Sequence, residues 1–214
     1  MDLRGPLEIA FIDVDETLVQ FDIDWDRVRL ETRYFLKEAD IRSPRGLHVM
    51  LCKLAESRPD LLLRALENLR NHEYKGIERS KGTPGAESLL YFLSRKNILL
   101  YAVSTNDAGA IEKILKKHGL KEYFAGIIGR TNTFQGFRLL KPNPIAVLHT
   151  LQGLHIHRSH AIVIGNSVTD AKLARSAHMQ GYIYSSTLQS KRNIVVAKTL
   201  GDLKATILKK WKFL

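Results

Sequence analysis

The sequence of 214 residues predicts an α/β fold: a parallel sheet with helices on both faces and an all-helical segment inserted near its start. Three observations lead to this prediction. From about residue 97 onward, short apolar runs alternate with helical patterns, which is typical of consecutive βαβ units. Residues 24–75 show helical periodicity only. A hydrophobic fraction of 44% at this length suits one globular domain, or one domain carrying an insert.

The first half of the chain predicts one strand followed by helices. LEIAFIDVDETL, residues 7–18, is a short apolar run that ends in carboxylates, as a buried strand would. Capping residues and prolines predict three helices, which begin at Asp24, at Ser43-Pro44 and at Pro59-Asp60. We expect no strand among these helices, so they form an insert into the α/β domain.

The second half predicts four strands that alternate with helices. The strands are expected at 97–104, 125–129, 161–165 and 182–184. The helices are expected from Thr83-Pro84, at 107–118 with Gly119 ending it, and at 144–151, 169–178 and 201–211.

Composition excludes several classes of protein. No run of about 18 apolar residues exists, so no membrane-spanning helix is expected. Asp13 and Asp15 interrupt the N-terminal apolar stretch, unlike a secretion signal. The single cysteine, Cys52, cannot form an internal disulfide, and we expect a cytoplasmic protein.

The net charge is +11, and residues 186–214 carry seven basic side chains against one acidic side chain. Such an end could attract nucleic acid or a membrane surface. We interpret it as a solvated helix face, and expect neither nucleic acid nor a membrane as a partner.

Asp13 and Asp15 carry the first sign of chemistry. Residues i and i+2 of an extended chain point the same way, so both carboxylates face one site. Two neighbouring acids at a strand end repel each other unless a cation or a shared proton relieves them. Mg²⁺ prefers such oxygens, and ligands of open parallel sheets bind at the carboxyl ends of strands. A helix N-cap pair without chemistry is the alternative.

Other predicted strand ends carry matching groups. Ser104, Thr105 and Asn106 end the second strand with hydroxyls and an amide. Lys141 precedes a helix, and Asn166 and Asp170 follow the strand at 161–165. Acids, hydroxyls and a cation at one sheet edge can bind a metal and a phosphoryl group together.

These residues resemble four motifs of the haloacid dehalogenase-like superfamily, whose members include aspartyl-phosphate phosphohydrolases. DVDET at 13–17 is similar to the DxDxT motif, and the strand ending in Ser104 to the second motif. Lys141 with Pro142 resembles the third, and GNSVTD at 165–170 the fourth, which is usually GDSxxD. The four occur in order over the whole chain.

The resemblance implies a role for each matching residue. Asp13 would be the nucleophile, Asp15 the general acid and base, and Lys141 the cation that neutralises the phosphoryl group. The phosphate-binding set would be Thr17, Ser104, Thr105 and Asn106. The Mg²⁺ ligands would come from Asp13, Val14 through its carbonyl, Asp15, Asn166 and Asp170.

The resemblance also implies a fold and a substrate class. It predicts a Rossmann-like core of residues 1–20 and 81–214 and a helical cap of residues 21–80 that covers the site. The activity would be Mg²⁺-dependent hydrolysis of a small phosphorylated metabolite. A phosphosugar mutase, or a non-catalytic binding protein for anions or nucleic acid, is the alternative.

Two positions depart from the family pattern or leave it open. Asn166 stands where an acid is usual and brings an oxygen without a charge. In the second motif, Ser104 fits best as the phosphate-binding hydroxyl, with Asn97 aligned to the glycine that often precedes this strand, and Thr105 is the alternative.

Overall fold

A six-stranded parallel sheet forms the centre of the molecule in the computed structural model, which describes residues 5–213. Its strands are β1 (Ile9–Ile12), β4 (Leu99–Asp107), β5 (Gly126–Arg130), β6 (Ala161–Gly165), β7 (Gln180–Tyr184) and β8 (Ile194–Ala197). They lie in the order β5-β4-β1-β6-β7-β8, and every neighbouring pair is parallel. The predicted α/β fold is confirmed, with β1 in the interior of the sheet between β4 and β6.

The two faces of the sheet bury alternate side chains of each strand, as the pleat requires. Ile9 and Phe11 of β1 pack with α7 (Ile145–Gly153) and α8 (Val168–Ser176). Ala10 and Ile12 pack with α4 (Ala86–Arg95), α5 (Ala108–Lys117) and α9 (Leu200–Lys210) on the opposite face. Strands β1 and β6 are therefore buried on both sides, which explains their continuous apolar runs in the sequence.

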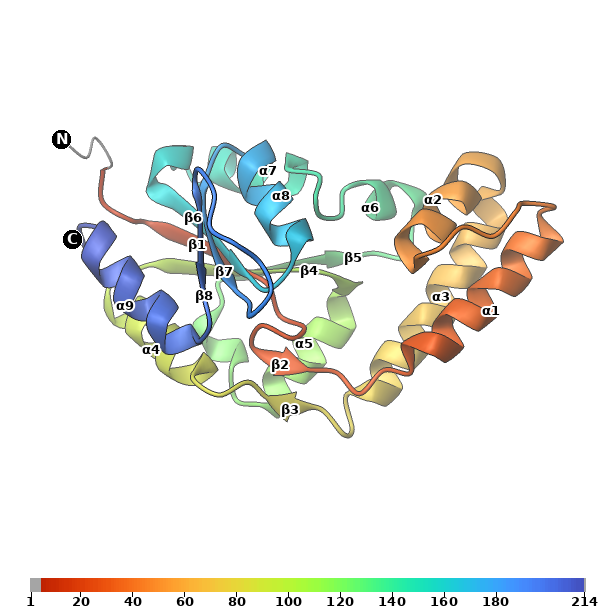
Figure 1. Ribbon diagram of the computed structural model, residues 1–214, viewed down its shortest axis with the longest axis horizontal. Coiled ribbons are helices and arrows are strands. Elements are labelled where there is room, and N and C mark those ends of the chain that lie inside the picture. The colour runs from red at the N-terminus through yellow and green to blue at the C-terminus, as the bar shows by residue number, and fades with distance from the viewer. Residues whose placement is uncertain (1–4, 214) are drawn as a thin grey trace.

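The helical segment lies at one end of the molecule, beyond the sheet (Figure 1). It consists of α1 (Trp25–Glu38), α2 (Leu47–Ser57) and α3 (Pro59–Gly76), which pack against one another. The chain leaves the sheet domain through β2 (Val19–Gln20) and returns through β3 (Lys81–Gly82), and these two short strands pair antiparallel. The segment is thus joined to the core by two adjacent connections.

Two helices begin later than the sequence predicts because a left-handed glycine precedes each of them. Helix α2 begins at Leu47 rather than at Ser43, since Gly46 has φ 92° and only its carbonyl starts the helical hydrogen bonds. Helix α4 begins at Ala86 behind Gly85, which has φ 86°. By contrast, Asp24 accepts a hydrogen bond from the Arg27 N–H, which confirms the predicted cap of α1.

Some short elements were not predicted. They are β2, β3, α6 (Phe134–Arg138), β8, and the single 3₁₀ turns η1 (Lys121–Tyr123) and η2 (Arg158–His160). Each is too short to show a hydrophobic period, and β8 lies at the edge of the sheet.

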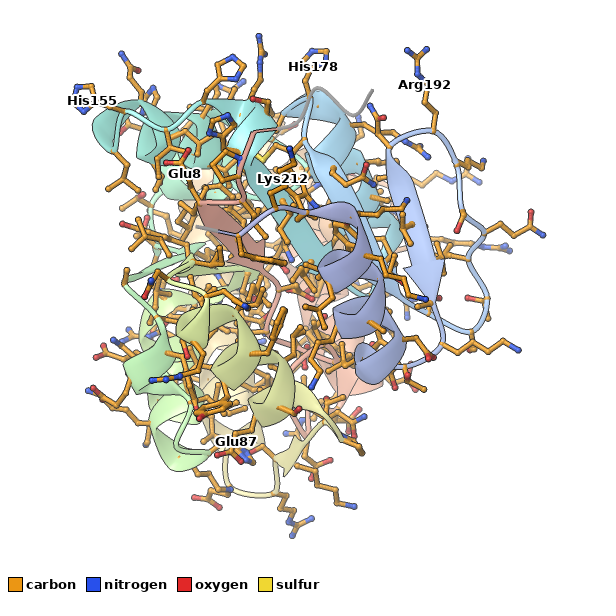
Figure 2. All side chains as sticks on the ribbon, turned by 90° about the vertical axis from the view of Figure 1, so that its left-hand side faces the viewer. Glu8, Glu87, His155, His178, Arg192 and Lys212 are labelled. Atoms are coloured by element: carbon orange, nitrogen blue, oxygen red, sulfur yellow. The ribbon has the colours of Figure 1, made fainter. Side chains whose placement is uncertain are left out.

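Charged side chains cover the outside of the C-terminal region. Arg192, before β8, and His178 point away from the body of the molecule (Figure 2). Lys209, Lys210 and Lys212 are exposed on and after α9, while Leu203 and Ile207 of the same helix are buried. The basic end is thus the solvated side of an amphipathic helix. Within the described residues, no helix is long and apolar enough to cross a membrane.

Candidate active site

The carboxyl ends of β1, β4 and β6 meet at one edge of the sheet, because these strands are direct neighbours. Asp13 follows β1, and its N–H donates to the Ile164 carbonyl of β6 at 2.8 Å. Strand β4 is longer than predicted and continues through a register shift to Asp107. This extension brings residues 104–106 to the same edge, so the predicted strand ends do come together.

Asp13 is held by a lysine and a hydroxyl. The Lys141 Nζ lies 2.5 Å from Asp13 Oδ1 and 2.7 Å from Asp170 Oδ1. The Thr17 Oγ1 donates to Asp13 Oδ2 at 2.9 Å. The residues Asp13 and Lys141 are 6% and 7% exposed, while Thr17 and Asp170 are fully buried. One cation therefore lies between two buried carboxylates, with one oxygen of Asp13 oriented by Thr17.

Burial sets the protonation chemistry of this group. Loss of water, together with the negative charge of Asp170, raises the pKa of Asp13 to about 6, although Lys141 opposes the shift. Burial alone would lower the pKa of Lys141, but the carboxylates of Asp13 and Asp170 outweigh it and raise that pKa above its usual value. Lys141 is thus a permanent cation at this edge.

Asp15 lies beside Asp13 in a different environment. Its Oδ1 accepts a hydrogen bond from the Phe21 N–H at 3.1 Å. Burial raises the pKa of Asp15 to about 7, with further contributions from the charges of Asp13, Glu16 and Glu73. A carboxyl that titrates near neutral pH can both give and take a proton.

A cavity of about 190 Å³ joins the predicted residues. Its lining comprises Asp13, Asp15, Glu16, Trp25, Thr105, Asn106, Lys141, Asn166, Ser167 and Thr169. Trp25, from α1, brings the helical segment to the site and was not predicted. The Asn106 Nδ2 atom is buried without a hydrogen-bond partner. An unpaired buried donor is costly, so it indicates a place for an acceptor such as a phosphoryl oxygen.

The second motif contributes Thr105 and Asn106 to this cavity, and Ser104 lies behind them. Ser104 is 2% exposed, and its hydroxyl exchanges hydrogen bonds with Asn106, donating to Oδ1 at 3.1 Å and accepting from the N–H at 3.2 Å. Ser104 lines a separate cavity of about 140 Å³ instead. This geometry favours Thr105 rather than Ser104 as the hydroxyl that faces the cavity, and the Ser104 hydroxyl orients Asn106.

Three of the residues predicted to bind phosphate or metal instead make hydrogen bonds inside the protein. Thr17 orients Asp13 from a fully buried position. Asp170 accepts the N–H groups of Asn166 and Ser167 and the Ser167 hydroxyl on Oδ2, and Lys141 on Oδ1. The Val14 carbonyl accepts the N–H groups of residues 17, 18 and 19 at 3.3, 2.9 and 3.1 Å, which leaves it no lone pair for a metal ion.

The remaining donors suit a hard cation. Asp13, Asp15 and Asn166 carry oxygens at the cavity, and the Asn166 Nδ2 donates to Glu16 Oε2 at 3.2 Å. In the described part of the chain, no three or more His, Cys, Asp or Glu side chains are arranged to hold a metal ion by themselves. Mg²⁺ needs only one or two carboxylates and completes its shell with water and phosphate oxygens, so the donor set fits this ion.

A buried ion pair next to the site joins the helical segment to the sheet. The Arg130 guanidinium of β5 donates to both carboxylate oxygens of Glu73 on α3, at 2.9 and 2.7 Å, and each residue is 1% exposed. Glu73 also accepts the Asp107 N–H, and Arg130 donates to the Thr105 carbonyl. The partners are 57 residues apart, so no local pattern in the sequence pointed to this pair.

An all-parallel α/β sheet with paired aspartates and a lysine at its carboxyl edge defines a class of phosphoryl-binding α/β proteins. A profile of the haloacid dehalogenase-like hydrolase family matches residues 34–183. A phosphoglycolate phosphatase of Photobacterium profundum is 31% identical over 170 residues, which cover 74% of this chain and 70% of that protein. The chain belongs to the haloacid dehalogenase-like hydrolase family.

Other relatives agree with this assignment. A haloacid dehalogenase-like hydrolase domain-containing protein of Arabidopsis thaliana is 28% identical over 79% of this chain, and the chain spans 62% of that longer protein. Among solved structures, a predicted phosphatase from Clostridium acetobutylicum superposes with a TM-score of 0.71 at 20% identity, covering 96% of this chain and 100% of that one. This chain is thus a phosphatase-like enzyme of the family.

Proposed function

We propose that this protein hydrolyses a small phosphate monoester in a Mg²⁺-dependent reaction that passes through a phosphorylated Asp13. The observation that carries the proposal is the buried Asp13 carboxylate, held by Lys141 and Thr17 at a cavity where the Asn106 amide lacks an acceptor. Phosphoglycolate phosphatases among the relatives support a phosphate monoester as the substrate. A magnesium-bound hydrolase of Bacillus subtilis with the same fold supports the metal.

The substrate phosphoryl group would lie between Asp13, Lys141 and the β4 turn. Lys141 and the Asn106 amide, with the Thr105 side chain, bind its oxygens. Mg²⁺, held by Asp13 and Asn166 with water, would offset the negative charge of the phosphoryl group when bound. The like-charge repulsion between a carboxylate and a phosphate monoester is the main barrier to attack, so these cations are needed at this point.

Two proton transfers at Asp15 complete the reaction. An Asp13 oxygen attacks phosphorus, the bond from phosphorus to the alcohol oxygen breaks, and protonated Asp15 gives its proton to that oxygen. Asp15, now a carboxylate, then takes a proton from water as the water oxygen attacks the same phosphorus. The bond between phosphorus and Asp13 breaks, which releases inorganic phosphate and restores both side chains.

The helical segment would act as the cap in this reaction. We propose residues 21–80 as a cap that covers the site and residues 1–20 and 81–214 as the catalytic core, with Trp25 as the cap's contribution to the cavity wall. Exclusion of water by a cap strengthens the electrostatic interactions with the phosphoryl group. A cytoplasmic location would suit a phosphorylated metabolite as substrate.

The test is hydrolysis of p-nitrophenyl phosphate and phosphoglycolate with Mg²⁺, with EDTA, and by Asp13→Asn. We expect metal-dependent turnover by the wild type and a loss of more than about 10³-fold in the variant, because the nucleophile is removed. Asp26→Asn, an exposed change at the start of α1, is the matched control and keeps its activity. Undiminished turnover by Asp13→Asn, or in EDTA, would contradict the mechanism.

A further inference from the structure

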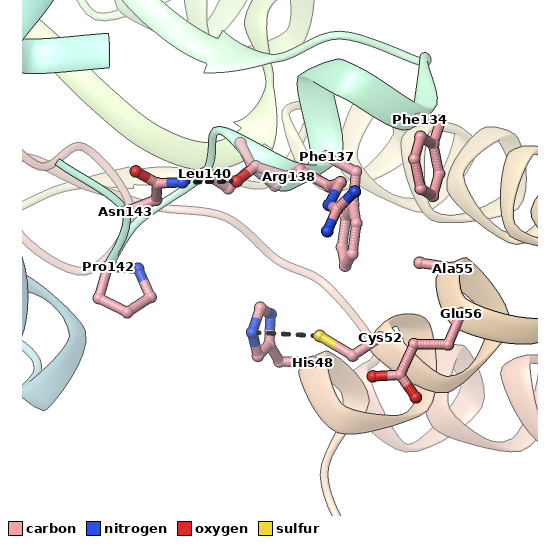
Figure 3. Close-up of a pocket in the computed structure, with 10 residues that line it drawn as sticks. All are labelled: His48, Cys52, Ala55, Glu56, Phe134, Phe137, Arg138, Leu140, Pro142 and Asn143. Atoms are coloured by element: carbon pink, nitrogen blue, oxygen red, sulfur yellow. Dashed lines mark hydrogen bonds between the residues drawn. The ribbon is translucent and has the colours of Figure 1, made fainter. Parts of the chain in front are cut away.

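A larger groove opens beyond the catalytic cavity, between α2 of the helical segment and α6 (Figure 3). Its volume is about 630 Å³. Its apolar lining comprises Ala55, Phe134, Phe137, Leu140 and Pro142. We name this space, with Cys52 at its α2 side, the tail groove.

The tail groove adjoins the catalytic cavity through a third cavity that shares lining residues with both. A middle cavity of about 240 Å³ shares Trp25, Thr105, Asn106, Lys141 and Thr169 with the cavity at Asp13. The same middle cavity shares His48, Phe137, Leu140 and Pro142 with the tail groove. The rings of His48 and Phe137, with their centroids 6.0 Å apart, contact each other and line both the middle cavity and the tail groove.

The size of the groove exceeds what a two-carbon alcohol needs. The cavity at Asp13 and the middle cavity hold a phosphoryl group and a short leaving group, and each is smaller than the usual range of about 300–1,000 Å³ for a small-molecule site. The tail groove falls within that range and shares four lining residues with the middle cavity.

The charges of the groove favour an uncharged tail. Glu56, the acid of its lining, forms an ion pair with Lys53, whose Nζ lies 3.3 Å from Glu56 Oε2. The Arg138 guanidinium lies over the Phe134 ring, 5.3 Å from its centroid, so it contributes apolar surface and an aromatic contact. Apolar side chains from α2, α6 and the loop before α7 thus converge on a space whose acid is already paired and whose base covers a ring.

We propose that the physiological substrate is a phosphate monoester of an extended apolar alcohol, whose tail lies in the tail groove while its phosphoryl group reaches Asp13. This substrate class rests on the proposed phosphatase activity. His48 and Phe137 contact the part of the alcohol that passes between the two spaces.

A series of n-alkyl phosphates from ethyl to octyl tests the proposal. We expect kcat/KM to rise about twofold per added methylene, half the free energy of a fully buried CH₂, because the groove is open on one side. If p-nitrophenyl phosphate and ethyl phosphate are hydrolysed but chain length has no effect, the proposed role of the tail groove is contradicted while the proposed phosphatase activity stands. Failure to hydrolyse any phosphate monoester would instead contradict the proposed function.

A groove-filling variant supplies a second measurement. Ala55→Trp places a large ring in the groove, and we expect the ratio of kcat/KM for octyl phosphate to that for ethyl phosphate to fall at least tenfold. Ser57→Trp, at the exposed end of the same helix, is the matched control and keeps the wild-type ratio. An unchanged ratio in Ala55→Trp would contradict the proposal.

Cys52 gives a readout that needs no turnover. It is the single cysteine of the chain, it lines the groove, and its Sγ lies 3.5 Å from the His48 Nε2. In Asp13→Asn, which holds substrate without consuming it, we expect octyl phosphate to slow alkylation of Cys52 by N-ethylmaleimide at least fivefold. Inorganic phosphate is the control and leaves the rate unchanged. Equal rates with and without saturating octyl phosphate would overturn the proposal, whether or not Ala55→Trp folds.

Discussion

Asn166 stands where an acid is usual in the fourth motif, and it has nearly the same shape as an aspartate but no charge. Its amide is hydrogen-bonded to Glu16 at the cavity, and its N–H supports Asp170. An amide oxygen can bind Mg²⁺ but contributes no negative charge, so a Mg²⁺ ion at the proposed site would have one carboxylate fewer than an aspartate at this position would give.

Replacing this amide with a carboxylate tests that argument. We expect Asn166→Asp to tighten Mg²⁺ binding about tenfold, because a charged ligand replaces a neutral one of the same size. Isothermal titration calorimetry with MgCl₂ measures it directly. Asn71→Asp, which makes the same change on the exposed side of α3, leaves the affinity unaltered. If both variants bind Mg²⁺ as the wild type does, Asn166 is no ligand.

At the level of residues, the sequence predicted which residues lie at the site better than it predicted what each of them contacts there. The spacing of Asp13 and Asp15 placed both acids at one strand end, and both line the cavity. The choice between Ser104 and Thr105 depended on where β4 bends. Whether the Val14 carbonyl is free to bind a metal ion depended on the turn that follows β1. Both are set by hydrogen bonds that no pattern of residue types displays.

Among the elements, α1 and α3 are joined by a charge cluster around Glu31. This carboxylate accepts hydrogen bonds from Arg27 of its own helix and from Asn68 and His72 of α3. These bonds, with Arg27 the largest contributor, lower the pKa of Glu31 to about 2. A carboxyl with a lowered pKa stabilises the fold when ionised.

The pH dependence of the stability follows from that shift. The contribution of Glu31 is fully present above pH 4.5, its ordinary pKa, and is lost as the pH falls toward 2. We expect Glu31→Gln to lower the free energy of unfolding by about 1 kcal/mol at pH 7, since the pair is partly exposed. Urea denaturation at pH 7, 5 and 3.5 measures it, with exposed Glu87→Gln as the control. A deficit that grows on acidification would contradict the sign.

The elements that escaped prediction share a physical reason. Helix α6 spans five residues, less than two helical turns, and strand β8 spans four residues at the edge of the sheet, where three of them are only partly buried. The left-handed glycines before α2 and α4 shifted the starts of these helices, because Gly46 and Gly85 adopt a conformation that proline or serine caps do not signal. Long, doubly buried strands such as β6 were predicted with their observed bounds.

For the whole molecule, the net charge of +11 predicts weak, salt-sensitive attraction to polyanions rather than a specific nucleic-acid site. The exposed lysines of the C-terminal region lie before, on and after α9 and are spread over the surface. Fluorescence anisotropy with labelled duplex DNA should give a dissociation constant above about 1 μM at 150 mM salt, weakening steeply with added salt. Tight binding that persists at high salt would contradict this expectation.

The Glu73–Arg130 pair also fixes α3 against the sheet next to the site. A swing of α3 away from the sheet would break the two bonds to Arg130 and the bond to the Asp107 N–H together. Hydrogen bonds to charged groups contribute about 1.5–3 kcal/mol each, so the helices and the sheet move as one body at this corner. Glu73 and Arg130 both line the middle cavity, so the pair also holds that wall of the cavity in place.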